Sequence, residues 1–401
     1  MKKILGILGL LVVVCLLTTI VSDRFLTAYN VENVVRRTAL FGILSIGAAF
    51  VIITSGIDLS IGSIVCLTGC MLPWLLVGQD MSPWLALPLL AVLSVGIGFA
   101  HGWFITKLKL QPFVVTLCGL LLYRGATRGI VADQSQGFRG EYEGLKWLAQ
   151  GSLSLSDTPD VLMVILVSLS LLVCLVTQVV VLIHAFRSSV LWGFVCFGIP
   201  IAWLYYAIER FEHPRKRLIL GAWVSSVIVS GCCALTAWTD FGIPVPCVIL
   251  VVVAVLAATF LHRTVWGRYL KALGRNEEAA RYSGIDTDKM VILAYVVCGL
   301  LSGLGGMLFV LDVGSAQPVD FGSFYELYAI AAAVLGGCSL RGGEGSVLGV
   351  IIGAALMQVL RNAIVLIDAI PNNIEFAVIG IVILAGVSAD ELVRRAVAAR
   401  R

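Results

Sequence analysis

An acidic and a hydroxyl side chain stand close together near the start of the chain, inside a long apolar stretch. They belong to the segment Thr54-Ser55-Gly56-Ile57-Asp58-Leu59-Ser60-Ile61-Gly62-Ser63. An ionisable residue within or beside a membrane span is costly unless it is satisfied, so Asp58 and Ser60 are candidates for hydrogen bonding to a polar solute that crosses the membrane. A structural role competes with this one, because both residues are good N-caps for the helix that follows, while Gly56 and Gly62 permit a tight turn and close packing.

Four other polar side chains lie in or beside apolar segments and are candidates for the same path: Gln111, Thr116, Gln358 and Asn362. Their amide and hydroxyl groups suit hydrogen bonding to hydroxyls. Each could equally bond to a neighbouring helix, as polar side chains in membranes often do. The tryptophans are better interpreted as interfacial belts than as a stacking site: Trp74, Trp84, Trp103 and Trp266.

A polar stretch, Gly267 to Gly284, lies between two long apolar runs. Asn276 can cap a helix of one or two turns, whose first turn carries Glu277 and Glu278 at the positive end of the dipole, and Gly284 can end it. Ala279 and Ala280 would leave the surface of this helix open to close approach. The alternative is a solvated connecting loop, which is the usual reason for a run of charges.

A third cluster is rich in glycine and runs from Gly336 to Ser346. It contains Gly336, Gly337, Gly342, Gly343 and Gly345, and it is followed by Gly349 and Gly353. A phosphate loop would need a Gly-Lys-Ser/Thr ending, which is absent here. Gly345, Gly349 and Gly353 recur every four residues, a spacing that predicts one helix face for close packing or a hinge.

No motif in the sequence indicates an enzyme. There is no Gly-x-Ser-x-Gly elbow and no His-Glu-x-x-His. The 11 cysteines are scattered without a Cys-x-x-Cys, and the four histidines (His101, His184, His213 and His262) have no ligand spacing, so we expect neither a metal site nor a disulfide framework.

The composition predicts a polytopic membrane protein. Of the 401 residues, 59% are hydrophobic and 13% are charged, and apolar runs of spanning length recur along the chain. The longest polar stretches have only the size of connectors. An ATPase or a solute-binding domain would therefore have to be another chain.

We expect an all-α protein with about twelve transmembrane helices. The expected spans are 4–21, 38–54, 59–78, 84–106, 112–130, 161–183, 218–238, 244–262, 290–311, 326–340, 346–366 and 374–389. Basic residues flank several of them: Lys2, Lys3, Lys107, Lys109, Arg394, Arg395, Arg400 and Arg401. By the positive-inside rule, both termini and the 263–289 segment are cytoplasmic.

Two apolar runs are interpreted separately. A span at 190–207 would break this parity, so we interpret it as an interfacial or re-entrant segment. The run 4–21 could be a signal peptide, but it lacks a convincing cleavage site, which favours an uncleaved first helix.

Together the motifs resemble a known family, the membrane-spanning permeases of ATP-binding-cassette (ABC) importers for monosaccharides of the ribose and xylose type. The resemblance rests on Ser55 to Ser63, Gly242-Ile243-Pro244-Val245-Pro246, Arg263-Thr264 with Gly267-Arg268-Tyr269, Gly274 to Ile285, and Gly336 to Gly353. It covers nearly the whole chain apart from about 158–240. That segment then looks like an insertion with two extra spans in a ten-helix permease core, as in longer xylose-type members.

The resemblance implies a subunit of the bacterial inner membrane that carries a pentose or hexose inward and binds no cofactor itself. ATP and Mg²⁺ would be bound by a separate cytoplasmic ATPase. A periplasmic or lipid-anchored sugar-binding protein and a second permease copy or paralogue would complete the importer. The implied ATPase-coupling residues are Asn276, Glu277, Glu278, Ala279, Ala280, Arg281, Ser283 and Gly284.

Other functions stay open. Within ABC importers, the solute could be a nucleoside, an amino acid or a furanosyl signalling molecule. A secondary transporter driven by an ion gradient is the main alternative from another class, and it predicts buried ionisable pairs and an inverted repeat. An intramembrane enzyme would need a nucleophile with its base, or clustered acidic ligands. The sequence departs from the family at Arg275, where a second glycine is common.

Overall fold

The computed structural model divides the chain into two compact units. One consists of Met1–Ser152 with Pro244–Arg401, and the other is Leu153–Ile243. The structure describes residues 2–153, 173, 174, 176–185, 206, 211, 219, 223, 224, 226, 242–367, 377, 378, 380, 381 and 384. Leu153–Ile243 closely brackets the expected insertion 158–240, and its longest described helix is Val176–Ala185.

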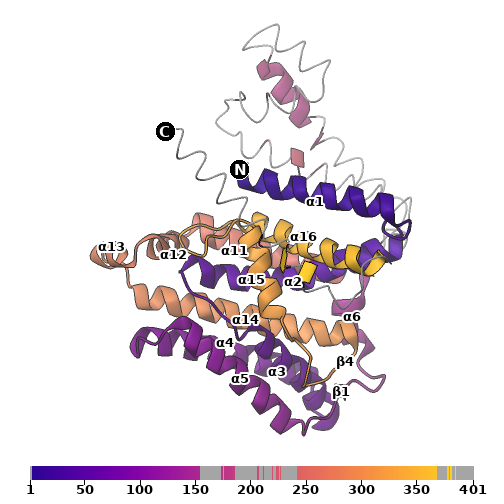
Figure 1. The fold of residues 1–401 in the computed structure, drawn as a ribbon, viewed down its shortest axis with the longest axis vertical. Coiled ribbons are helices and arrows are strands. Elements are labelled where there is room, and N and C mark those ends of the chain that lie inside the picture. Colours follow the sequence, from indigo (N-terminus) through magenta and orange to yellow (C-terminus); the bar gives the residue numbers. More distant parts are fainter. Residues whose placement is uncertain are drawn as a thin grey trace. The chain divides into compact units, whose positions relative to one another are not determined.

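The larger unit is mostly helical (Figure 1). Its helices are α1 (Lys2–Val21), α2 (Ala28–Ile53), α3 (Ile61–Pro73), the π-helix η1 (Trp74–Gly78), α4 (Pro83–Lys107), α5 (Pro112–Ile130), α6 (Glu143–Gln150), α11 (Val245–Arg263), α12 (Val265–Arg275), α13 (Glu277–Tyr282), α14 (Thr287–Val313), α15 (Tyr325–Leu335) and α16 (Val347–Leu366). Two-residue strands add little: β1 (Gln136–Gly137) pairs antiparallel with β4 (Ser315–Ala316), and β2 (Ser152–Leu153) pairs with β3 (Ile243–Pro244).

Helices α2 and α14 form the centre of this unit. Every residue of α2 from Ala39 to Ile53 is buried, and α14 packs against α2, α3 and α4. Apolarity alone does not explain this central position, because α11 is more apolar than α2, yet its spanning window is 28% buried against 83% for α2. Helices α4 and α14 approach closely because Gly299 lies against the backbone of Ser94 and Gly98 lies against that of Tyr295.

Seven helices in the described part of the chain are long and apolar enough to cross a membrane. The expected spans 84–106, 112–130, 244–262, 290–311 and 346–366 coincide with α4, α5, α11, α14 and α16 to within three residues at each end. The expected span 4–21 likewise lies within α1, Lys2–Val21. The chain is thus a mostly helical, multi-span protein, whereas the total of twelve spans stays a prediction.

Three expected spans differ from the observed helices. Helix α2 begins at Ala28, ten residues before the expected start at 38. The expected span began with the apolar run, whereas the helix also includes the more polar residues 28–37. The span 59–78 is α3 followed by the π-turn η1, and the break coincides with Pro73, which has no N–H to donate. The span 326–340 was wrong as a continuous helix. Helix α15 has 11 residues, or about 16 Å of rise, which is short of the roughly 30 Å hydrocarbon core.

Several expectations fall largely outside the described residues. These are the spans 161–183, 218–238 and 374–389 and the apolar segment 190–207. They stay predictions.

Candidate functional site

The polar stretch predicted to be a short helix is the helix α13, which is capped at both ends. The Asn276 Oδ1 atom accepts the backbone N–H of Ala279 at 2.9 Å, as an N-cap should. At the other end the N–H of Ile285 donates to the Ala280 carbonyl at 3.1 Å, and that of Gly284 donates to Arg281 at 3.0 Å. With Gly284 at φ +79°, this is a Schellman motif. These caps therefore stabilise a helix of only six residues, although other helices do not cover it on every side.

Helix α13 exposes most of its surface. Glu278 and Ala279 are exposed, and Tyr282 is 92% exposed. Ala280 is only 4% exposed, so the expectation that both alanines leave an open surface was wrong for Ala280. Its methyl group faces the protein because a helix of this length still needs one buried contact. Sequence reasoning did not single out Tyr282, although an aromatic residue in a polar stretch was a usable signal.

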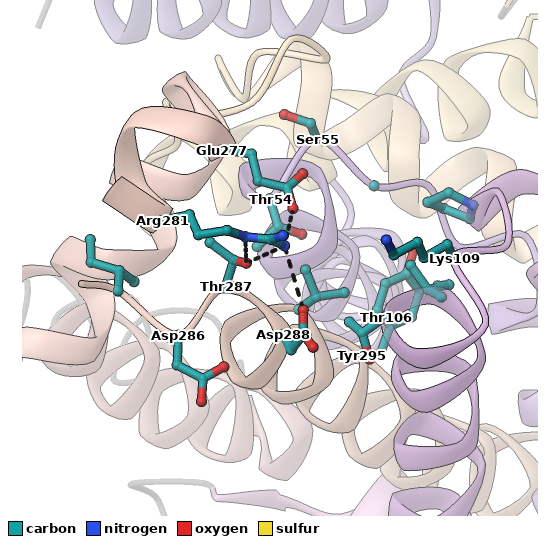
Figure 2. A pocket seen from close by; sticks show the side chains of 15 residues that line it. Thr54, Ser55, Thr106, Lys109, Glu277, Arg281, Asp286, Thr287, Asp288 and Tyr295 are labelled. Atoms are coloured by element: carbon teal, nitrogen blue, oxygen red, sulfur yellow. Dashed lines mark hydrogen bonds and ion pairs between the residues drawn. The ribbon is translucent and has the colours of Figure 1, made fainter. Parts of the chain in front are cut away.

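Arg281 joins α13 to the start of α14. Its guanidinium donates to the Thr287 hydroxyl at 3.0 Å, and it lies 3.3 Å from the Glu277 carboxylate and 3.7 Å from that of Asp288 (Figure 2). Asp288 also accepts the Lys107 ammonium at 2.7 Å, which reaches it from the end of α4. One carboxylate thus links three helices.

The first turn of α14 is capped by Asp286. Its Oδ1 atom accepts the Lys289 N–H at 3.1 Å, and its Oδ2 atom lies 2.9 Å from the Lys289 ammonium. The hydrogen bonds from Lys289 lower the pKa of Asp286. Because the folded-state pKa is depressed, the contribution of this cap is present at neutral pH and is lost only as the pH falls through the lowered pKa.

A cavity of about 680 Å³ lies against this ion-pair network. Its walls come from α13, the start of α14, the end of α4 and the α2–α3 connection, and Figure 2 shows Lys109 on the wall opposite Arg281. Thr54, Ser55 and Gly56 supply the part of the wall that belongs to the connection. The cavity therefore touches two of the three segments that the sequence singles out.

The third segment meets the other two beside the cavity. The Gly343 N–H donates to the Ile53 carbonyl at 2.9 Å, and the Ser55 hydroxyl donates to the carbonyls of Gly274 and Arg341 at 3.2 and 3.0 Å. Gly343 has φ +74°, and a Cβ there would overlap Arg275 at the end of α12. Three distant stretches of sequence are thus joined backbone to backbone where α12 ends.

The glycine cluster also brings α15 and α16 together. A Cβ at Gly349 would overlap the Gly336 carbonyl, and one at Gly353 would overlap the Ala332 carbonyl. These contacts are the close helix packing that small residues permit. Gly345 does not share the helix face predicted for it, because α16 begins at Val347, and it packs instead on Ile53 and Cys338. Gly337 and Gly342 lie in the connecting turn with φ +92° and +82°.

Asp58 and Ser60 bond to each other. The Ser60 N–H and hydroxyl both donate to Asp58 Oδ1, at 2.9 and 2.6 Å. Ser60 occupies the N-cap position of α3, yet neither side chain caps the helix, so that expectation was wrong. Both residues are buried, and Asp58 Oδ2 has no hydrogen-bond partner in the described part of the chain. Gly56 and Gly62 sit close by, with Gly56 against the Tyr295 hydroxyl.

Two further ionisable side chains are buried in the helical bundle, and the sequence reasoning gave neither a role. Glu326 is 8% exposed and lies against Gly62, while His101 is 2% exposed and has its Nε2 atom 2.8 Å from the Tyr123 hydroxyl. A glutamate inside an apolar run was the available signal for the first. Like Asp58, both are buried among the helices.

The remaining path candidates lie elsewhere. Thr116 is buried and donates to the Pro112 carbonyl, and Gln111 occupies the N-cap position of α5. Gln358 and Asn362 lie on the last turns of α16 and line a separate cavity of about 260 Å³. Within the described ranges, no group of three or more His, Cys, Asp or Glu side chains could hold a metal ion.

The family described as branched-chain amino acid transport system / permease component matches residues 30–387. The chain belongs to this permease family. It is therefore a transport subunit and a multi-pass protein of the bacterial cytoplasmic membrane. No solved structure matches the permease.

Relatives resemble the permease along almost its whole length. The ribose import permease protein of Escherichia coli K12 is 30% identical over 96% of this chain and 92% of its own. The xylose transport system permease protein of Haemophilus influenzae is 30% identical over 96% of this chain and 94% of its own. The ribose import permease protein of Bacillus subtilis is 30% identical over 97% and 93%, respectively.

Proposed function

We propose that the chain is the membrane-spanning permease subunit of an ABC importer that moves a monosaccharide into the cytoplasm. The solute is a pentose or hexose resembling ribose or xylose. The observation that carries this proposal is the end-to-end similarity to permeases named for ribose and xylose import. The family description names amino acid transport, but the similarity to sugar permeases covers 96–97% of the chain.

The exposed helix α13 is the part that receives the ATPase. It is short, capped at both ends and presents Glu278, Ala279 and Tyr282 outward. Closure of an ATP-bound partner on this helix would push it against the start of α14, to which Arg281 binds it. ATP and Mg²⁺ belong to that partner, and this chain needs no cofactor of its own.

The rest of the importer follows from this role. With the α13 end in the cytoplasm, both termini are cytoplasmic and the chain crosses the membrane about twelve times, two of them in the 158–240 insertion. A second permease copy or paralogue forms the other half of the pathway, and a sugar-binding protein delivers the solute from the outer side.

One observation favours a second candidate, a transporter driven by an ion gradient. Asp58, Glu326 and His101 are all buried among the helices, and such residues often mark ion pathways. This candidate needs no ATPase, so it gives α13 no partner.

Copurification from native membranes separates the two candidates. We expect the tagged chain, extracted in mild detergent, to bring with it a stoichiometric protein that contains a phosphate-binding loop. Repeated isolation of the chain alone would contradict the ABC importer and favour the gradient-driven transporter.

The Asp288 network predicts partial uncoupling when its central charge is removed. Asp288→Asn leaves Arg281 and Lys107 without their shared carboxylate. Each partly exposed ion pair contributes about 0.2–1 kcal/mol, so we expect the sugar transported per ATP hydrolysed to fall about two- to tenfold in the reconstituted importer.

The matched control is Glu143→Gln, which removes another surface ion pair, with Lys146 at 2.6 Å, far from α13 in the sequence. It should transport normally. Equal coupling ratios in Asp288→Asn and the wild type would show that the network does not transmit motion.

A further inference from the structure

The smaller cavity, of about 260 Å³, lies between the first turns of α2 and the last turns of α16. Its lining is unusually polar for a membrane bundle and includes two arginines and three amides: Arg37, Arg361, Asn33, Asn362 and Gln358. Val34 and Val365 complete it.

A reciprocal amide pair holds the two helices beside the cavity. Asn30 Nδ2 donates to Asn362 Oδ1 at 3.0 Å, and Asn362 Nδ2 donates back to Asn30 Oδ1 at 2.7 Å. Arg361 is placed by the ring of Tyr328, whose centroid lies 5.7 Å from its guanidinium carbon. The walls are therefore formed by side chains that already have fixed positions.

Gln358 differs from its neighbours. It is 3% exposed overall and lines the cavity, and its amide atoms are not among the buried polar atoms that lack a partner in the described part of the chain. Buried polar groups are almost always paired, so an amide in this place needs partners on the cavity side. A solute hydroxyl in the cavity can bond to this amide.

The lining suits hydroxyl groups. The amides of Gln358 and Asn33 each offer donors and an acceptor, and a hydroxyl both donates and accepts. The guanidinium groups of Arg37 and Arg361 add donors in a planar fork. A simple anion would use only the donors and would leave the amide acceptors unused. The volume is small, below the usual range for drug-sized ligands, which fits a compact polyol.

The cavity lies toward the opposite end of α2 from α13. Arg37 and Ile53 are separated along α2 by about 24 Å of helical rise. Ile53 contacts the segments around Gly274 and Gly343, next to α12 and α13. If α13 is cytoplasmic, the cavity belongs to the half of the permease that faces the sugar-binding protein.

We propose that this cavity is an outer-side monosaccharide site, in which the Gln358 amide binds the sugar hydroxyls. The site rests on the proposed function, since it names where the transported sugar first contacts the permease. Asn33 and the two arginines complete the contacts, and the Asn30–Asn362 pair holds the walls.

Transport by the complete importer in proteoliposomes, measured with radiolabelled ribose and xylose, tests this proposal. We expect Gln358→Leu to lower the maximal rate about tenfold or more and Gln358→Asn, which keeps an amide, to recover part of it. Asn33→Leu, at a less buried position, should also lower the rate. Met357→Leu, a volume-conserving change at the next residue of α16, is the control and should transport normally.

A second measurement reports occupancy directly. Val365 lines the cavity and is 55% exposed, so a cysteine placed there should react with a maleimide, in addition to any labelling of the parent chain. Ribose or xylose should slow the labelling of this added cysteine. The protection should disappear when Gln358→Leu is added.

The outcomes distinguish the two proposals. A wild-type importer that moves neither sugar would reject the proposed function itself. A wild-type importer that moves sugar, with normal rates in Gln358→Leu and Asn33→Leu and no protection of the introduced cysteine, would overturn the cavity assignment alone.

Discussion

Ala279→Trp should reduce ATP-driven sugar uptake by about a hundredfold, while the chain still inserts into the membrane. Ala279 is exposed on α13, and its small side chain allows a partner to approach the helix closely. An indole at this position would hold the ATPase away, at a cost comparable to the loss of a central interface contact. ATP hydrolysis should persist but no longer depend on the sugar-loaded binding protein.

Two controls accompany this variant. Ala279→Ser keeps a small side chain at the same position and should transport normally, and Glu141→Trp adds an indole on an exposed residue outside α13. Normal uptake in Ala279→Trp would remove α13 as the ATPase-coupling helix. Ala280 is unsuitable for this test because it is buried, so a bulky residue there would disturb folding first.

The second large effect is expected at the contact between α15 and α16. In Gly349→Leu the added side chain would occupy the space of the Gly336 carbonyl, and the helices would have to separate. Overpacking of this kind costs about 3 kcal/mol, so we expect a strong loss of folded protein in detergent extracts and a lower thermal unfolding temperature.

Gly96→Leu is the matched control for this substitution. It makes the same change inside α4, where a Cβ would have no atom of the described structure within 4 Å. If Gly349→Leu had the yield and activity of the wild type, the close packing of α15 and α16 would be refuted.

The sequence predicted those parts of the fold that depend on local chemistry. The start and end of α5 at Pro112 and Ile130 follow from a proline that begins the helix and an apolar run. The short helix α13 follows from Asn276 and Gly284, which cap it in the way their residue types predict.

Features that depend on tertiary contacts could not be predicted in this way. Composition cannot show which face of α13 is buried, so Ala280 was misassigned. The Asp58 carboxylate accepts hydrogen bonds from Ser60, two residues on, instead of capping α3; this local turn competes with a cap, and the residue types alone do not decide between them. The segment after α15 reaches Ile53, which is far away in the sequence, through the Gly343 N–H.

The candidate site could be predicted in its parts but not in its arrangement. The segments around Ser55, Gly274 and Gly343 each stood out by composition. Their meeting beside one cavity depends on backbone contacts between distant residues. Gln358 and Asn362 line a cavity that Asp58 does not line, and the path that they were expected to share with Asp58 stays a prediction.

The most direct measurement of the central claim is uptake of radiolabelled ribose and xylose by proteoliposomes that contain the chain, its ATPase and its binding protein. We expect accumulation that requires ATP on the side of α13 and that persists when proton and sodium gradients are abolished. Uptake by the chain alone, driven by an ion gradient and indifferent to ATP, would contradict the account.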